Sequence, residues 1–70
     1  MTDTDMLREV ISKNRWSITA LSKELGISRQ SFYNKMNGDA EFLASEIVHL
    51  SNLLELNNSQ RNRIFLCDQK

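Results

Sequence analysis

Residues 17–38 contain the feature that most restricts how this chain can fold, namely two short apolar stripes separated by a glycine. The apolar positions are Leu21 and Leu25, then Ile27, then Phe32 and Met36. Side chains four residues apart lie on one face of an α-helix, and Gly26 suits the left-handed residue that commonly ends one. The segment therefore predicts two helices, over about 18–25 and about 29–36, that close on one core as a helix-turn-helix.

A serine is expected to set the start of each of these helices. Ser17 and Ser28 stand at the N-cap positions, where a hydroxyl accepts a hydrogen bond from a free N–H of the first turn. Ser22 lies where the helices would cross, and its small side chain allows close approach. Because Ser28 defines where the second helix begins, it also defines the side chains that project from its leading end. These are Arg29, Gln30, Ser31, Tyr33 and Asn34.

The order of a leucine, a small residue, a glycine and two further apolar residues, closed by Asn37-Gly38, resembles the helix-turn-helix of the Cro/CI-type repressors of temperate phages and their bacterial relatives. The resemblance runs from about Ser17 to Gly38 and extends more loosely over the whole chain. It implies an all-α, lambda-repressor-like bundle of about five short helices that binds DNA, with one helix before the motif and two after it.

Two positions depart from this family pattern. Ile18 stands where the family often has a glutamine that reaches a phosphate, so that contact is not carried over. Lys35 stands at the usual apolar position three residues after Phe32, and we expect Met36 to take over the packing.

The chain of 70 residues leaves room for one domain, spanning residues 1–70. Besides the motif at about 17–38, the apolar periodicity predicts three helices. Their ranges are about 5–14, about 44–54 and about 59–66, the last two within a C-terminal part over about 43–66. Asn58 or Ser59 is expected to cap the final helix, Trp16 to pack onto Leu21, and the segment NGDAEF to form a polar loop.

Net charge is zero, but the charges are segregated along the chain. Residues 15–38 hold four basic residues against one acidic residue, whereas residues 1–14 and 39–70 are both acidic overall. The motif alone is therefore basic, which is the sign expected of a surface that meets phosphates. The field is weak, so we expect low affinity for DNA of arbitrary sequence.

The residues that would carry catalysis are scarce, and we predict no enzymatic activity, no cofactor, no metal and no small-molecule ligand. His49 is the single histidine and has no second ligand at metal spacing, and Cys67 has no histidine partner. Asp39 and Glu41 are interpreted as part of a polar loop. A single cysteine excludes an internal disulfide, and with no signal peptide or apolar run of about 18 residues we expect a cytoplasmic protein of a bacterial host cell.

Two sets of residues are expected to contact double-stranded operator DNA. Side chains that read base edges in the major groove are Arg29, Gln30, Tyr33 and Asn34. Groups that hold phosphates are Ser17, Thr19, Ser28, Ser31, Lys35, Asn37 and the backbone N–H of Gly38. The alternative is that this polar face is no more than the solvated side of an amphipathic helix. The turn glycine, the capped start and the local positive charge favour DNA reading.

A single recognition helix covers few base pairs, so domains of this kind generally bind as pairs over a two-fold operator. The C-terminal part has a surplus of apolar residues that either complete the core or form an interface, in a homodimer or in a complex with another protein. These are Val48, Leu53, Leu56, Ile64, Phe65 and Leu66.

A second hypothesis is a modulator or antirepressor that binds a CI-type repressor and alters its DNA binding. Its motivation is the loop after the motif, where the family that this chain resembles frequently has basic residues but this chain has Asp39 and Glu41. Carboxylates there would repel phosphates. Small phage proteins that resemble this chain include such modulators of repression.

Overall fold

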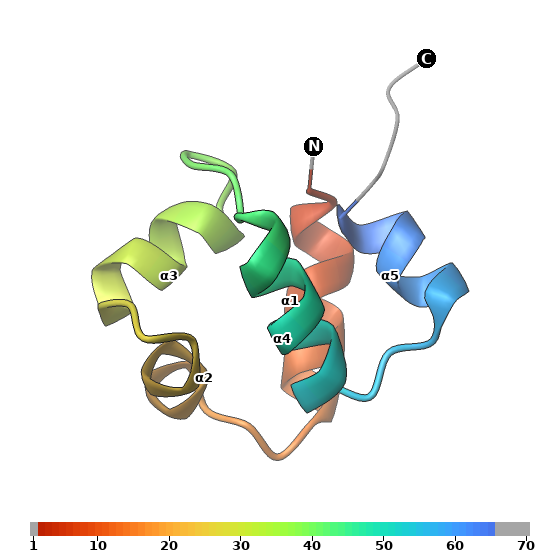
Figure 1. The fold of residues 1–70 in the computed structure, drawn as a ribbon, viewed down its shortest axis with the longest axis horizontal. Coiled ribbons are helices and arrows are strands. Elements are labelled where there is room, and N and C mark those ends of the chain that lie inside the picture. The colour runs from red at the N-terminus through yellow and green to blue at the C-terminus, as the bar shows by residue number, and fades with distance from the viewer. Residues whose placement is uncertain (1, 66–70) are drawn as a thin grey trace.

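Five α-helices account for the regular structure of residues 2–65, which are the residues that this computed structural model describes. They are α1 (Thr4–Lys13), α2 (Ile18–Leu25), α3 (Arg29–Met36), α4 (Ala44–Leu53) and α5 (Asn58–Phe65) (Figure 1). The predicted all-α bundle is confirmed, and the two motif helices have the predicted bounds. The ends of the other three helices lie within one residue of the predicted positions wherever those positions are described, and α4 begins at the predicted Ala44.

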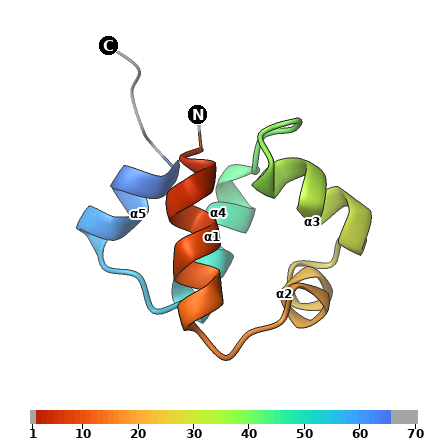
Figure 2. The ribbon, with the colours of Figure 1, turned by 180° about the vertical axis from the view of Figure 1, so that it is seen from behind.

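The helices α1 and α4 lie at the centre of the bundle (Figures 1 and 2). The pair α2 and α3 packs on one side of them and α5 on the other, with α1 contacting α3 and α5 while α4 contacts α2 and α5. This arrangement leaves the outer side of α3 at the edge of the molecule. None of the helices in residues 2–65 has the length and apolar character needed to cross a bilayer.

Local hydrogen bonds set the helix starts of the motif as the sequence predicts. The hydroxyl of Ser17 accepts from the backbone N–H of Ala20 at 3.0 Å, and that of Ser28 accepts from Ser31 at 3.0 Å. Gly26 ends α2 with φ +74°, in the left-handed region. An alanine there would be strained even though nothing lies within 4 Å of its Cβ.

The start of α5 corrects the predicted cap at Asn58 or Ser59. The side chain of Asn57 accepts from the N–H of Gln60 at 2.7 Å, and the Gln60 side chain accepts in return from the N–H of Asn57 at 3.0 Å. This reciprocal pair is a capping box, with the cap one residue earlier than predicted.

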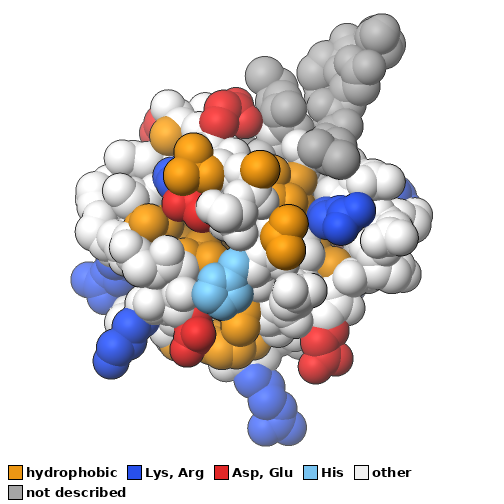
Figure 3. Space-filling model, in the orientation of Figure 1, with side chains coloured by type: hydrophobic (Ala, Val, Ile, Leu, Met, Phe, Trp, Pro, Cys, Tyr) orange, Lys and Arg blue, Asp and Glu red, His pale blue; other side chains and the backbone are white. Residues whose placement is uncertain are grey.

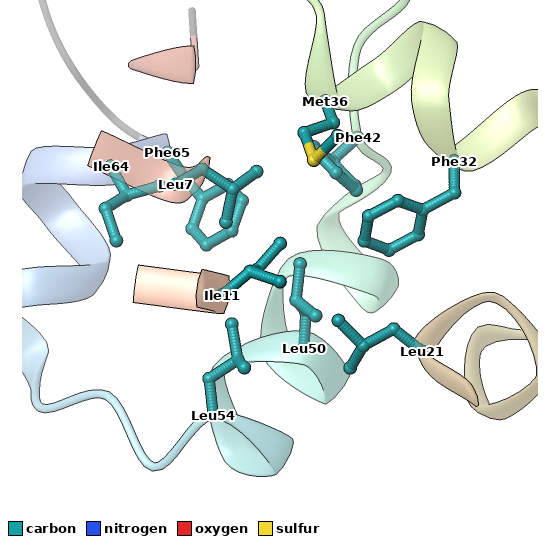
Figure 4. Close-up of a cluster of buried hydrophobic side chains, with 10 residues drawn as sticks. All are labelled: Leu7, Ile11, Leu21, Phe32, Met36, Phe42, Leu50, Leu54, Ile64 and Phe65. Carbon is teal, nitrogen blue, oxygen red and sulfur yellow. The ribbon is translucent and has the colours of Figure 1, made fainter. Parts of the chain in front are cut away.

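The core lies between the two central helices and the elements on either side of them (Figure 4). Its members are Leu7, Ile11, Leu21, Phe32, Met36, Phe42, Leu50, Leu54, Ile64 and Phe65. Phe42 is the member that the sequence reading missed, because it ends a segment predicted to be a polar loop. Its ring packs edge to face on Phe32 at 5.9 Å between centroids and on Phe65 at 5.5 Å, so it joins the motif to α5.

The apolar surplus of the C-terminal part is mostly used inside the molecule. Ile64 and Phe65 are 0% and 3% exposed, so for these two the interface alternative is wrong and they complete the core. Leu53 and Leu56 are half-buried against the same core. Val48 is exposed, and Leu66 lies outside the described residues.

Trp16 connects the turn before α2 to the far end of α4. Its indole Nε1–H donates to the carbonyl oxygen of Leu53 at 3.0 Å, across 37 positions of the chain. Its ring is half-buried against the core. The predicted structural role of Trp16 therefore includes a hydrogen bond to α4 that no local spacing indicated.

Candidate nucleic-acid interface

The helix α3 presents a polar side to solvent because its apolar side is anchored from behind. Phe32 and Met36 are buried, whereas Arg29, Gln30 and Tyr33 are exposed and Asn34 is half-buried. These four predicted base-reading residues thus come from one short helix at the edge of the molecule (Figure 1). The turn into α3 is stiffened by the N–H of Ile27, which donates to the carbonyl of Ser22 at 3.0 Å.

Hydrogen bonds between side chains orient this polar face in the free protein. The Nε2 of Gln30 donates to the Oδ1 of Asn34 at 3.1 Å. The Nη1 of Arg29 donates to the hydroxyl of Thr19 on α2 at 3.3 Å, which brings together a predicted base contact and a predicted phosphate contact. Such contacts reduce the conformational entropy that binding has to remove.

The hydroxyl-bearing residues among the predicted phosphate contacts lie at the starts of the two motif helices. Ser17 and Ser28 use their oxygens as acceptors for the caps, so each hydroxyl hydrogen is still available for donation. Thr19 is exposed in the first turn of α2, and Ser31 is half-buried in the first turn of α3.

The predicted contacts at the other end of α3 differ from expectation. The N–H of Gly38 donates to the carbonyl of Lys35 at 3.2 Å, so this N–H is already used within the chain. Asn37 is exposed, and its Oδ1 accepts a hydrogen bond from the guanidinium of Arg8. The sequence reading did not select Arg8, because only tertiary packing places α1 beside the end of α3.

Lys35 departs most from its predicted phosphate role. Its ammonium Nζ lies 2.6 Å and 2.7 Å from the two carboxylate oxygens of Glu46, and its side chain is 14% exposed. The carboxylate also accepts from the N–H of Leu43 at 2.9 Å. A capping box normally has a serine or threonine at the N-cap, but the N-cap of α4 is Leu43, whose side chain has no acceptor. Only one of the two hydrogen bonds of the box is therefore made, the one from the N–H of Leu43 to the carboxylate of Glu46. In this structure Lys35 is thus tied to α4 and is not turned to solvent.

The acidic loop after α3 lies against the end of that helix. The N–H groups of Asp39 and Ala40 both donate to the carbonyl of Asn34, at 2.8 Å and 3.2 Å. Asp39 and Glu41 are exposed. The loop that carries these two exposed carboxylates is therefore hydrogen-bonded to α3, and their charge is opposite in sign to that of Arg29 and Lys35.

Apolar side chains reach solvent along α4, which faces the viewer in Figure 3. Leu43, just before the helix, is 60% exposed and Val48 is 53% exposed. His49 is exposed on the same helix. Residues 2–65 bring together no group of three histidine, cysteine or acidic side chains that could hold a metal ion.

Comparison with known proteins identifies the family. No curated protein and no solved structure matches the chain. A family model for bacterial regulatory proteins of the Fis family matches residues 1–37, which is more than half of the 70 residues and includes α1, α2 and α3. The match supports a helix-turn-helix regulator of Fis type, and the finer Cro/CI resemblance stays a prediction. The chain belongs to the Fis family of bacterial regulatory proteins and is a DNA-binding transcriptional regulator.

Proposed function

We propose that this protein is a transcriptional regulator of phage type that acts as Cro/CI-type repressors do, binding double-stranded operator DNA with α3 in the major groove. The observation that carries the proposal is the two-sided character of α3. Phe32 and Met36 hold it to the bundle, while Arg29, Gln30 and Tyr33 reach solvent on the other side. A helix with one anchored side and a polar outer side fits the major groove.

The pairing of Gln30 with Asn34 supports base reading by these two residues. With Gln30 donating to Asn34, the Gln30 oxygen and the Asn34 amide N–H groups are free for DNA. If the oxygen and nitrogen positions of both side-chain amides are exchanged, Asn34 donates to Gln30 instead. One acceptor oxygen and one set of N–H donors are then still left for DNA. An acceptor beside a donor matches the N6 amino group and N7 of adenine.

Gln30→Ala is expected to weaken binding to the operator by about 1–3 kcal/mol and to leave binding to random duplex DNA unchanged, because a base contact has been removed. Thermal stability should hold, since Gln30 is exposed. Fluorescence titrations against both duplexes measure the effect. Asn62→Ala removes an exposed amide on α5 and serves as the control. Equal losses on both duplexes would reduce Gln30 to a phosphate contact.

Binding as a homodimer on a two-fold operator belongs to the same proposal. One α3 reaches only a few base pairs, and two copies about 34 Å apart would read successive turns of the groove on one side of the duplex. Sedimentation of the protein with and without its promoter DNA tests this expectation. Binding of a single copy with full affinity would contradict it.

A second candidate function is modulation of a CI-type repressor through direct binding. The observation that favours it is that Asp39 and Glu41 are exposed in the loop after α3 and that Leu43 and Val48 are exposed in the segment that follows. A surface of this kind suits a partner with a basic rim around an apolar patch.

Replacing Asp39 and Glu41 together by Lys separates the two functions. If the loop approaches DNA, the double variant should bind DNA more tightly, and each added phosphate contact should change the slope of log K against log salt by about −0.9. If the loop meets a basic partner, the variant should associate more slowly with that repressor and gain nothing on DNA. Titrations of DNA and of the repressor at two salt concentrations distinguish these results, with Glu55→Lys as a control that makes half of this +4 change in net charge at another exposed position. Tighter DNA binding with unchanged repressor binding would contradict the modulator function of this loop.

A further inference from the structure

The ion pair between Lys35 and Glu46 joins α3 to α4, and both side chains are largely shielded from solvent. Glu46 is 7% exposed and sits in the first turn of α4, and Lys35 sits in the last turn of α3. The ammonium contacts both carboxylate oxygens, at 2.6 Å and 2.7 Å. The only other cation on α3 is Arg29, at the opposite end of the helix. Pairing with Glu46 therefore leaves the second half of α3 without a free positive charge.

Stability alone is a poor reason for this pair. The free energy needed to remove two charges from water offsets much of the free energy gained by their attraction. Apolar residues of similar size commonly hold two helices together equally well. The pair has a further consequence at a DNA surface. Lys35 follows Asn34 and is one helical turn from Ser31, so it borders the polar side of α3. An unpaired lysine there has a chain long enough to turn outward to a phosphate.

We propose that Glu46 is a positioning residue that limits how tightly the DNA-binding surface binds DNA, acting through Lys35. By holding the ammonium, Glu46 withholds one phosphate contact, and this lowers affinity for DNA of any sequence while the base-reading residues keep their contacts. Affinity for the operator and for random sequence falls by the same factor, because phosphate contacts carry no sequence information. This inference rests on the proposed DNA-binding function.

The test compares Glu46→Gln with the wild type on a random-sequence duplex between 50 and 200 mM salt. The amide oxygen keeps an acceptor for the N–H of Leu43, while the charge that holds Lys35 is gone. One added phosphate contact per chain changes the salt slope by about −0.9, so the loss of affinity over this fourfold range should be about 3.5-fold larger than in the wild type. Binding at 50 mM salt should tighten.

Two controls distinguish a steeper slope caused by release of Lys35 from one caused by the change in net charge or by damage to the fold. Glu55→Gln changes net charge equally at an exposed position beyond the other end of α4, and it should leave the slope nearly unchanged. The double variant Lys35→Met/Glu46→Gln has the net charge of the wild type and no lysine to release. Its slope should return to the wild-type value.

Acetylation of lysines followed by mass spectrometry provides a readout that needs no DNA. Lys35 should react slowly in the wild type and at least several-fold faster in Glu46→Gln, whereas Lys13, whose side chain is 72% exposed, should react alike in both. Equal Lys35 reactivity in the two proteins would overturn the inference. So would equal salt slopes for two proteins that both bind DNA, and the proposed function would then stand. Absence of binding to any duplex by either protein would overturn the proposed function and this inference with it.

Discussion

Phe32→Ala is expected to lower the free energy of unfolding by about 3–5 kcal/mol, which is enough to unfold much of a domain this small. Phe32 is 0% exposed, and its ring meets Phe42 edge to face at 5.9 Å, so truncation leaves a cavity at the contact between the motif and the rest of the core. Urea unfolding followed by circular dichroism measures the loss.

The neighbouring Tyr33 supplies the control for this substitution. It lies on the same helix but is exposed, so Tyr33→Ala should cost less than about 1 kcal/mol while removing an aromatic ring of similar size. A cooperative transition unaffected by Phe32→Ala would show that α3 does not pack as described.

Lys35→Met is expected to destabilise the protein by about 3–5 kcal/mol, because it leaves the carboxylate of Glu46 buried without its cation. Glu46→Gln should cost less, since the long side chain of Lys35 can carry its ammonium into water. The double change Lys35→Met/Glu46→Leu should recover most of the loss through apolar packing.

Urea titrations of the three variants beside the wild type measure these differences in the free energy of unfolding. A loss below about 1 kcal/mol in Lys35→Met would show that the pair is solvated and weak, as exposed ion pairs are. Such a result would also remove the structural basis for the role proposed for Glu46 in DNA binding.

The motif could be predicted from the sequence alone, because the interactions that define it are local. The caps at Ser17 and Ser28 each join a hydroxyl to an N–H three residues later, and Gly26 ends α2 through its own backbone conformation. Helix spacing then separates the buried Phe32 from its exposed neighbours on α3. None of these features needs a distant partner, so each is readable from a few consecutive residues.

Features whose partners are far apart in the chain could not be predicted without the tertiary structure. Lys35 reads as a free cation until α4 brings Glu46 to it from 11 positions away, and Arg8 reaches Asn37 across 29 positions. From the sequence, Phe42 is interpreted as part of a polar loop, whereas in the structure its ring packs against Phe32 and Phe65. Side-chain spacing predicts which face of a helix is apolar, but which charges meet and which rings stack depends on how whole helices pack, and that is a property of the assembled core.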